Sequence, residues 1–339
     1  MLVQRIRLRN FPRLIFVLLV GFATLAINAQ KHELRFNSEG RFKIAQFTDL
    51  HIAYQDQRSE VAFECIQNVI ETEHPDLILL TGDIIYSQPA EANFRNVLNF
   101  VAKFKIPFAL TFGNHDWEQG MSNAQLLQIA QTIPYCLVAD ADGVTGDGNY
   151  LLKILASSSS KVASVLYCID SNSYSKLKER GVEGYDYIHR DQINWYAEES
   201  DKIIRTNGGQ PLPSLAFFHI PLPEYAMAAS HPDAQLYGTR REKVCSAALN
   251  SGMFAAFKEH GDVMGVFVGH DHDNDFAVAW HGVLLAYGRF SGGNTEYNHL
   301  TNGARIVEMT EGQRTFRTWI RLRDKEVVQQ TIFPSDYEK

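Results

Sequence analysis

The sequence predicts an α/β fold of four layers (α/β/β/α), in which two mixed sheets pack face to face and helices cover the outer face of each sheet. In the first half of the chain, short apolar runs alternate with segments of helical periodicity, which is typical of parallel βαβ units. Toward the end of the chain, apolar runs follow one another with only short turns between them, which indicates antiparallel strands. Two sheets stacked as layers accommodate both patterns.

The individual elements follow from the same patterns. In the first half we expect strands and helices in strict alternation, beginning with a strand, at residues 42–47, 59–72, 77–81, 91–104, 107–112 and 123–132. The second half is less regular, with one amphipathic helix at residues 191–204 and strands at residues 150–155, 164–169, 215–219 and 263–268. The antiparallel strands are expected at residues 277–280, 283–286, 304–309 and 314–321.

The first 29 residues have the composition of a secretory signal peptide. Four arginines precede an apolar run from Leu14 to Ile27, which is shorter than the roughly 20 residues of a membrane-spanning helix. We expect cleavage after Ala29, so that residues 30–339 form the mature catalytic domain, secreted or periplasmic and without a stable membrane span. An uncleaved anchor is the alternative, because Ile27 is larger than the residue preferred two places before a cleavage site.

The charge of the chain argues against a nucleic acid polymer as partner. Removal of residues 1–29 takes away four arginines and no acid, so the net charge changes from −7 to −11. Such an acidic surface repels a polyanion unless basic residues are concentrated in one patch. The cluster of Arg240, Arg241 and Lys243 is too small for that, but it suits a single phosphate. The sequence leaves the oligomeric state open.

Cysteine spacing argues against a metal site built from sulfur ligands. The four cysteines are far apart and form no Cys-x-x-Cys pair. In an oxidising compartment they could form one or two disulfides, or they could be buried free thiols, and the sequence does not decide between these. The four are Cys65, Cys136, Cys168 and Cys245.

Residues that bind metals follow directly after several of the predicted strands. In open α/β sheets, ligands gather beyond the carboxyl ends of strands, so donors placed there by separate strands can converge. Glycines precede several of these donors and let the backbone turn into the site. We therefore predict one metal site from Asp49, His51, Asp83, Asn114, His219, His270 and His272.

The donor types point to transition metals. Asp49 and His51 are two residues apart, as are His270 and His272, so each pair lies on one side of an extended chain. Carboxylate, imidazole and amide oxygen together suit Fe, Zn or Mn more than Mg or Ca, which prefer oxygen alone. We expect divalent or trivalent ions of this kind.

The motifs Asp-Leu-His, Gly-Asp, Gly-Asn-His-Asp, a later single His and Gly-His-Asp-His, in this order, resemble the calcineurin-like metallophosphoesterase superfamily. Thr-Gly-Asp and the stretch Asn250–Phe254 resemble its branch related to purple acid phosphatases. The resemblance implies a ββ sandwich flanked by helices and a dinuclear centre. It further implies that Asp83 bridges two metals, the first held by Asp49, His51 and His272 and the second by Asn114, His219 and His270.

Tyr86 marks a departure from the purple acid phosphatases. Those enzymes keep a tyrosine three residues after the bridging aspartate, where Tyr86 stands, but they have no histidine at the place of His51. A phenolate ligand would favour ferric iron. We interpret His51 as the ligand and Tyr86 as a residue of the pocket wall that contacts substrate.

The expected reaction is hydrolysis of a small-molecule phosphate ester. Two cations would activate a water for in-line attack on phosphorus and offset the charge on the phosphoryl oxygens. His115 would contact the substrate beside Asn114 and donate a proton to the leaving oxygen. Asp116 would orient His115, because a carboxylate paired with an imidazole fixes its tautomer and favours its protonated form.

The residues after His219 are expected to form a polar loop, through about Lys243, at the substrate entrance. Binding residues are often found on such loops, so Tyr225, Tyr237, Arg240 and Arg241 are candidate substrate contacts. We expect a phosphatase acting on monoesters. The alternatives are a phosphodiesterase acting on nucleotides or phospholipids, and a metal-binding protein without turnover.

Overall fold

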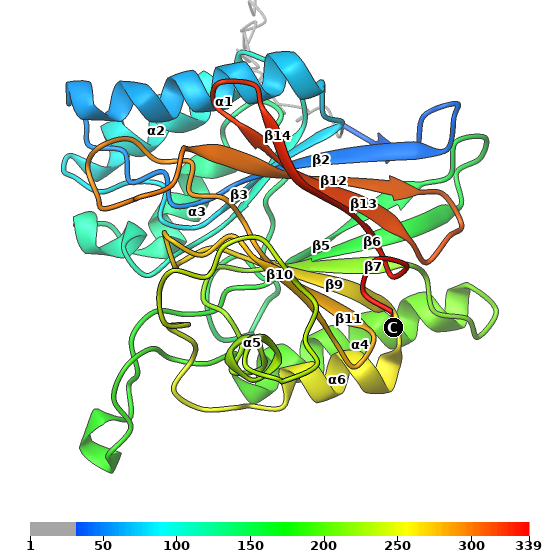
Figure 1. Ribbon diagram of the computed structural model, residues 1–339. Coiled ribbons are helices and arrows are strands. Elements are labelled where there is room, and N and C mark those ends of the chain that lie inside the picture. Colours follow the sequence, from blue (N-terminus) through cyan, green and yellow to red (C-terminus); the bar gives the residue numbers. More distant parts are fainter. Residues whose placement is uncertain (1–31, 339) are drawn as a thin grey trace, which may run out of the picture. The chain divides into compact units, whose positions relative to one another are not determined.

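Two sheets lie face to face in the computed structural model, which describes residues 32–338 (Figure 1). Helices α1 and α2 lie over the outer face of one sheet, and α4, α5 and α6 lie over the outer face of the other. The predicted four-layer α/β/β/α sandwich is confirmed. The predicted signal peptide, residues 1–29, falls outside the described residues.

The six-stranded sheet joins the two ends of the described chain. Three parallel strands come from the N-terminal part, and the helices α1 (Glu60–Glu73) and α2 (Ala90–Ala102) connect them, while α3 (Asn123–Ala130) packs against α2. Three antiparallel strands come from the C-terminal part, and β12 pairs directly with β2. The order across the sheet is β14 (Val327–Phe333), β13 (Phe316–Leu322), β12 (Gly303–Thr310), β2 (Arg41–Phe47), β3 (Leu77–Thr81) and β4 (Phe108–Thr111).

The eight-stranded sheet is also mixed. Its outer face carries α4 (Arg190–Thr206), α5 (Glu224–Ala229) and α6 (Met253–His260). In its centre, β6, β7, β9 and β11 are parallel neighbours. The order across the sheet is β1 (Leu34–Arg35), β5 (Tyr150–Leu155), β6 (Val162–Cys168), β7 (Ser214–Phe217), β9 (Val263–Val268), β11 (Val283–Tyr287), β10 (Ala277–Trp280) and β8 (Leu236–Tyr237).

Alternating side chains of the central strands divide the apolar residues between two cores. Around β7, Leu215 and Phe217 belong to the core that includes the space between the sheets. Ala216 and Phe218, which point the opposite way, belong to the core beneath α4, α5 and α6. Both faces of these strands are therefore buried, which is why their sequences read as continuous apolar runs.

The expected strands and helices are all present, and the structure has five further strands and α-helices that were not predicted. These are the short strands β1 and β8, the helices α5 and α6, and the strand β14. The two helices have six and eight residues, too few to show a clear helical period. In β14 most side chains are exposed or half-buried, so its apolar pattern is weak. The predicted antiparallel finish is confirmed for the pair β12 and β13 and for the pair β10 and β11.

All four cysteines are free thiols in this fold, and Cys65 and Cys168 are buried. This resolves the choice between disulfides and thiols that the sequence left open. Within residues 32–338, no helix has the length and apolar character needed to cross a lipid bilayer.

A buried carboxylate at the end of α1 ties this helix to the sheet beneath it. Glu73 accepts hydrogen bonds from Trp319 Nε1 (2.9 Å) and Arg321 Nε (2.6 Å) of β13, and it pairs with Lys43 Nζ of β2 at 3.2 Å. Burial by itself would raise the pKa of Glu73, but the hydrogen bonds from Trp319 and Arg321 outweigh it and lower this pKa below 4.5.

We predict that Glu73→Ala lowers the free energy of unfolding by about 3 kcal/mol, because it leaves buried donors without an acceptor. The stabilisation by ionised Glu73 is fully present above pH 4.5 and is lost as the pH falls through the lower pKa of the folded state. Urea unfolding at neutral and acidic pH measures this, with Glu71→Ala on the exposed side of α1 as control. Equal stability of the two variants at neutral pH would contradict the prediction.

Candidate metal centre

The predicted ligands come together where strand ends of both sheets meet. Asp49 and His51 follow β2, Asp83 follows β3, and Asn114 follows β4, all from the six-stranded sheet. The eight-stranded sheet supplies the other three after β7 and β9. None of the seven is more than 8% exposed. The seven are Asp49, His51, Asp83, Asn114, His219, His270 and His272.

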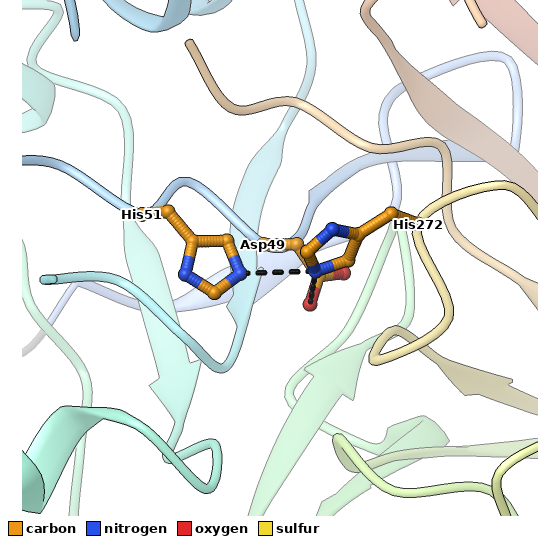
Figure 2. A group of neighbouring side chains, drawn as sticks. All are labelled: Asp49, His51 and His272. Atoms are coloured by element: carbon orange, nitrogen blue, oxygen red, sulfur yellow. Dashed lines mark hydrogen bonds and ion pairs between the residues drawn. The ribbon is translucent and has the colours of Figure 1, made fainter. Parts of the chain in front are cut away.

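The first ligand group consists of Asp49, His51 and His272, whose ligand atoms all lie within 4.8 Å of one another (Figure 2). Nε2 of His51 and Nε2 of His272 are 3.1 Å apart, and Oδ1 of Asp49 is 3.9 Å from Nε2 of His272. Each side chain directs its donor atom toward the same small space.

The second ligand group consists of Asp83, His219 and His270. Nε2 of His219 lies 3.1 Å from Oδ2 of Asp83 and 3.3 Å from Nδ1 of His270. Oδ1 of Asn114 is 3.2 Å from the same His219 nitrogen and so joins this group. Oδ2 of Asp83 also lies 3.8 Å from Nε2 of His51, which places this carboxylate between the two groups.

The chemistry of these donors fits a pair of metal ions. Nδ1 of His219 donates to the Thr81 carbonyl and Nδ1 of His272 to the Tyr297 carbonyl, each at 2.9 Å. In the neutral form of each ring, Nε2 therefore carries a lone pair that faces inward, toward other nitrogen and oxygen acceptors. Acceptors this close repel one another unless a proton or a metal ion lies between them. Backbone carbonyls that fix the ring orientation are the usual outer partners of metal-binding histidines.

Burial and charge have opposite effects on the histidine ligands. Burial holds the pKa of His51 and of His270 well below 6.5, so both rings are neutral near pH 7. At His219 burial also acts to lower the pKa, but the carboxylate of Asp83 raises it to about 10. A cation bound beside His219 would compete with the proton for the same lone pair.

Four of the predicted ligands have backbone conformations that side chains rarely adopt. The φ angles of Asp49, His51, Asp83 and His270 are 55°, 44°, 51° and 81°. Such left-handed conformations of residues other than glycine store strain and cluster at functional sites.

Two glycines allow the ligand loops to approach closely. A Cβ atom at Gly113 would overlap the Asp83 carboxylate, and one at Gly269 would overlap the side chain of Thr48. Thr48 in turn donates to Asp49 Oδ2 at 2.8 Å. These positions need glycine because carboxylates of neighbouring loops fill the space beside them.

The prediction that Asp116 orients His115 is wrong. Asp116 is fully buried, and its two oxygens accept hydrogen bonds from four backbone amides, those of residues 83, 84, 85 and 113, at 2.7–3.1 Å. It therefore fixes the loops that carry Asp83 and Asn114. The side chain points into the protein, away from the imidazole next to it in the sequence.

Glu118 is the residue that contacts the imidazole of His115. Nδ1 of His115 and Oε2 of Glu118 are 2.6 Å apart. Glu118 was not predicted from the sequence, where only the carboxylate directly after His115 was a candidate partner. A short 3-10 helix, η2 (Asp116–Gln119), brings the third residue after His115 back beside its ring.

Tyrosines form part of the wall around the ligands. The ring of Tyr86 lies 4.9 Å from that of His51 and 5.3 Å from that of His115. Its hydrogen bond to Glu296, with burial, raises the pKa of Tyr86 to about 12. The interpretation of Tyr86 as a pocket-wall residue stays a prediction. The sequence analysis missed Tyr185, whose ring is 4.2 Å from that of His270, and Tyr174, whose hydroxyl accepts from Asn114 Nδ2 at 3.4 Å.

The structure contradicts the prediction that Tyr225 contacts substrate. Its side chain is fully buried beneath the eight-stranded sheet, and its hydroxyl donates to the carbonyl of Val266 at 2.8 Å. The segment expected as a loop contains α5 and β8, and α5 draws Tyr225 into the core.

The basic residues of this segment bind backbone carbonyls in the structure. Arg240 Nη1 donates to the carbonyl of Ala229 at 3.0 Å, and Arg241 Nη1 donates to that of His299 at 3.1 Å. The Tyr237 hydroxyl donates to the carbonyl of Asp336 at 2.8 Å. A contact of Arg240 with phosphate therefore stays a prediction.

Comparisons with known proteins agree with this fold. The profile of the calcineurin-like phosphoesterase family matches residues 42–274. The "Probable inactive purple acid phosphatase 14" of Arabidopsis thaliana is 32% identical, over 92% of this chain and 88% of that protein. The "Phosphatase DCR2" of Saccharomyces cerevisiae is 31% identical, over 89% of this chain and 57% of that protein.

Among solved structures, a dimetal phosphatase from Danio rerio shares the fold, with a TM-score of 0.58 at 15% identity, over 88% of this chain and 99% of that chain. The sequence matches are stronger, since they cover most of this chain at about one third identity. The matched residues 42–274 include the positions of all seven predicted ligands. This chain therefore belongs to the calcineurin-like phosphoesterase family.

Proposed function

We propose that this protein hydrolyses phosphate esters, and monoesters in particular, at a dinuclear metal centre. The observation that carries the proposal is the pair of buried ligand groups that share the Asp83 carboxylate. Iron, zinc or manganese suits the mixture of nitrogen and oxygen donors. Asp49, His51 and His272 would hold one ion, Asn114, His219 and His270 the other, and Asp83 both.

When bound, two cations would supply hydroxide near neutral pH and offset the negative charge of the phosphoryl oxygens. The remaining steps belong to the protein. His115 gives the proton that the leaving oxygen needs, and it lies at the rim of the centre, with its ring 5.6 Å from that of His51.

Two other activities would use the same ligands. A phosphodiesterase would differ in the pocket around the second ester group. A metal-binding protein without turnover is suggested by the name of the Arabidopsis relative. The presence here of all seven candidate ligands and of His115 supports turnover, and the name of the yeast relative supports phosphatase activity.

We further propose that residues 1–29 are a signal peptide and that the mature protein is secreted or periplasmic. The support is the order of charged and apolar residues in the sequence. The exported protein should begin at Gln30, which N-terminal sequencing would show. A start at Met1 on exported protein would instead indicate an uncleaved anchor.

Turnover should depend on metal. We predict that the protein treated with a chelator is inactive on p-nitrophenyl phosphate and that added Mn²⁺ or Zn²⁺ restores hydrolysis, because the attacking hydroxide requires a bound cation. The release of nitrophenolate measures this, and bis-p-nitrophenyl phosphate tests diesters in parallel. The proposed activity would be contradicted if the protein binds two metal ions per chain but releases no nitrophenolate from either ester.

We predict that Asp83→Ala binds at most one metal ion per chain, because it removes the carboxylate shared by both ligand groups. Elemental analysis of the purified variant measures the metal content. Asp201→Ala, which changes an exposed carboxylate of α4, is the matched control and should keep two ions. Two ions per chain in Asp83→Ala would show that this residue does not bridge.

A further inference from the structure

We propose that Glu118 is the positioning residue for His115, and that it fixes the imidazole so that Nε2 faces the leaving oxygen of the ester. The proposal rests on the proposed hydrolysis. It assigns to Glu118 the part that the adjacent carboxylate of Asp116 cannot take. The observation behind it is the 2.6 Å contact between Nδ1 of His115 and Oε2 of Glu118.

This contact determines which nitrogen of His115 is free to act. A carboxylate oxygen only accepts hydrogen bonds, so Nδ1 must carry a proton and donate it to Glu118. Nε2 is then the nitrogen that can reach a substrate. A hydrogen bond at this distance to an ionised group is among the stronger ones in proteins, and it is directional.

The neighbouring rings restrict His115 further. The ring of Tyr86 stands edge-on to it, at 5.3 Å and 87°, and the ring of His51 lies at 5.6 Å. Packing of this kind limits the tilt of an imidazole but does not distinguish one face of the ring from the other. The hydrogen bond to Glu118 makes that distinction, because a flipped ring would place a carbon atom beside the carboxylate.

The turn that carries Glu118 is held from several sides. Asp116 anchors its inner side through four backbone amides. Trp117 Nε1 donates to Ser173 Oγ at 3.0 Å, and Ser173 Oγ donates to the Asn114 carbonyl at 3.2 Å. Gln119 Nε2 donates to the His115 carbonyl at 3.2 Å. The carboxylate of Glu118 is therefore presented from a rigid segment, as precise positioning requires.

Glu118 is suited to the role by its place at the edge of the centre. Its side chain is 32% exposed and that of His115 is 28% exposed, so both lie where an ester can enter. The neighbouring carboxylates have other partners, since Asp116 is saturated by backbone amides and Glu296 bonds to the Tyr86 hydroxyl.

The step that Glu118 supports is a single proton transfer. Hydroxide attacks phosphorus, the bond between phosphorus and the leaving oxygen breaks, and the Nε2 proton of the imidazolium passes to that oxygen. His115 is left neutral with its Nδ1 proton still donated to Glu118, which remains a carboxylate throughout. Water returns the Nε2 proton before the next turnover, so that no other co-reactant is needed.

The first test compares an ester with a poor leaving group and one with a good leaving group. For Glu118→Ala we expect kcat on phenyl phosphate to fall roughly 10- to 100-fold. On dinitrophenyl phosphate kcat should fall less than about 3-fold, because dinitrophenolate leaves without a proton. KM and the two metal ions per chain should be unchanged, and Glu118→Asp should recover part of the loss. Glu91→Ala, which removes an exposed ion-paired glutamate of α2, is the matched control.

The second test combines Glu118→Ala with His115→Ala. A residue that acts through His115 has nothing left to position in the double variant, so the double variant should be no slower on phenyl phosphate than His115→Ala alone. Proton NMR of the zinc-loaded protein adds a readout independent of turnover. The Nδ1 proton of His115, assigned with His115→Ala, should give a downfield signal that Glu118→Ala abolishes.

Several outcomes would overturn the role of Glu118 and leave the hydrolytic function intact. These are an equal loss on both esters, an unchanged rate on phenyl phosphate, a double variant slower by the product of the two single losses, or an Nδ1 proton signal that survives in Glu118→Ala. If the metal-loaded wild-type protein hydrolyses neither ester, the proposed function fails as well, and the role of Glu118 fails with it.

Discussion

The rest of the structure depends on one constraint at the metal centre. Two carboxylates, Asp49 and Asp83, and four imidazoles are removed from water and lie together in one small space. Two carboxylates cannot both stay ionised in such surroundings without compensation. Burial raises the pKa of Asp49, whereas at Asp83 the charge of His219 outweighs burial and lowers the pKa. Cations bound among these groups would favour the ionised form of both carboxylates.

The two sheets contribute different chemistry to this space. The six-stranded sheet brings both carboxylates, the amide of Asn114 and one imidazole, and the eight-stranded sheet brings the other three imidazoles. The site therefore exists only when the sheets are packed together. Beneath it, Gln46 Nε2 bonds to Thr81 Oγ1 within its own sheet and to the Val268 carbonyl of the other sheet. Metal binding and the packing of the sheets should stabilise each other.

Residues 114–116 are consecutive in the sequence, but each has a different role in the site. Asn114 faces the ligand groups, His115 lies at the rim, and Asp116 turns inward to hold three backbone amides after β3 and one after β4. Those amides belong to loops whose left-handed residues store strain, which the buried carboxylate offsets. The strain at Asp83 persists because hydrogen bonds on both sides of the loop define its path.

The sequence by itself determined the layers, most strand and helix positions and which seven residues are candidate metal ligands, because apolar period and strand-end donors are local properties of the chain. Tertiary structure decided which carboxylate meets His115, since a turn of η2 favours Glu118 over the adjacent Asp116. It also decided that Tyr225 is a core residue, because α5 forms only by packing against the sheet. Contacts of this kind depend on the direction of side chains in space, which sequence spacing does not specify.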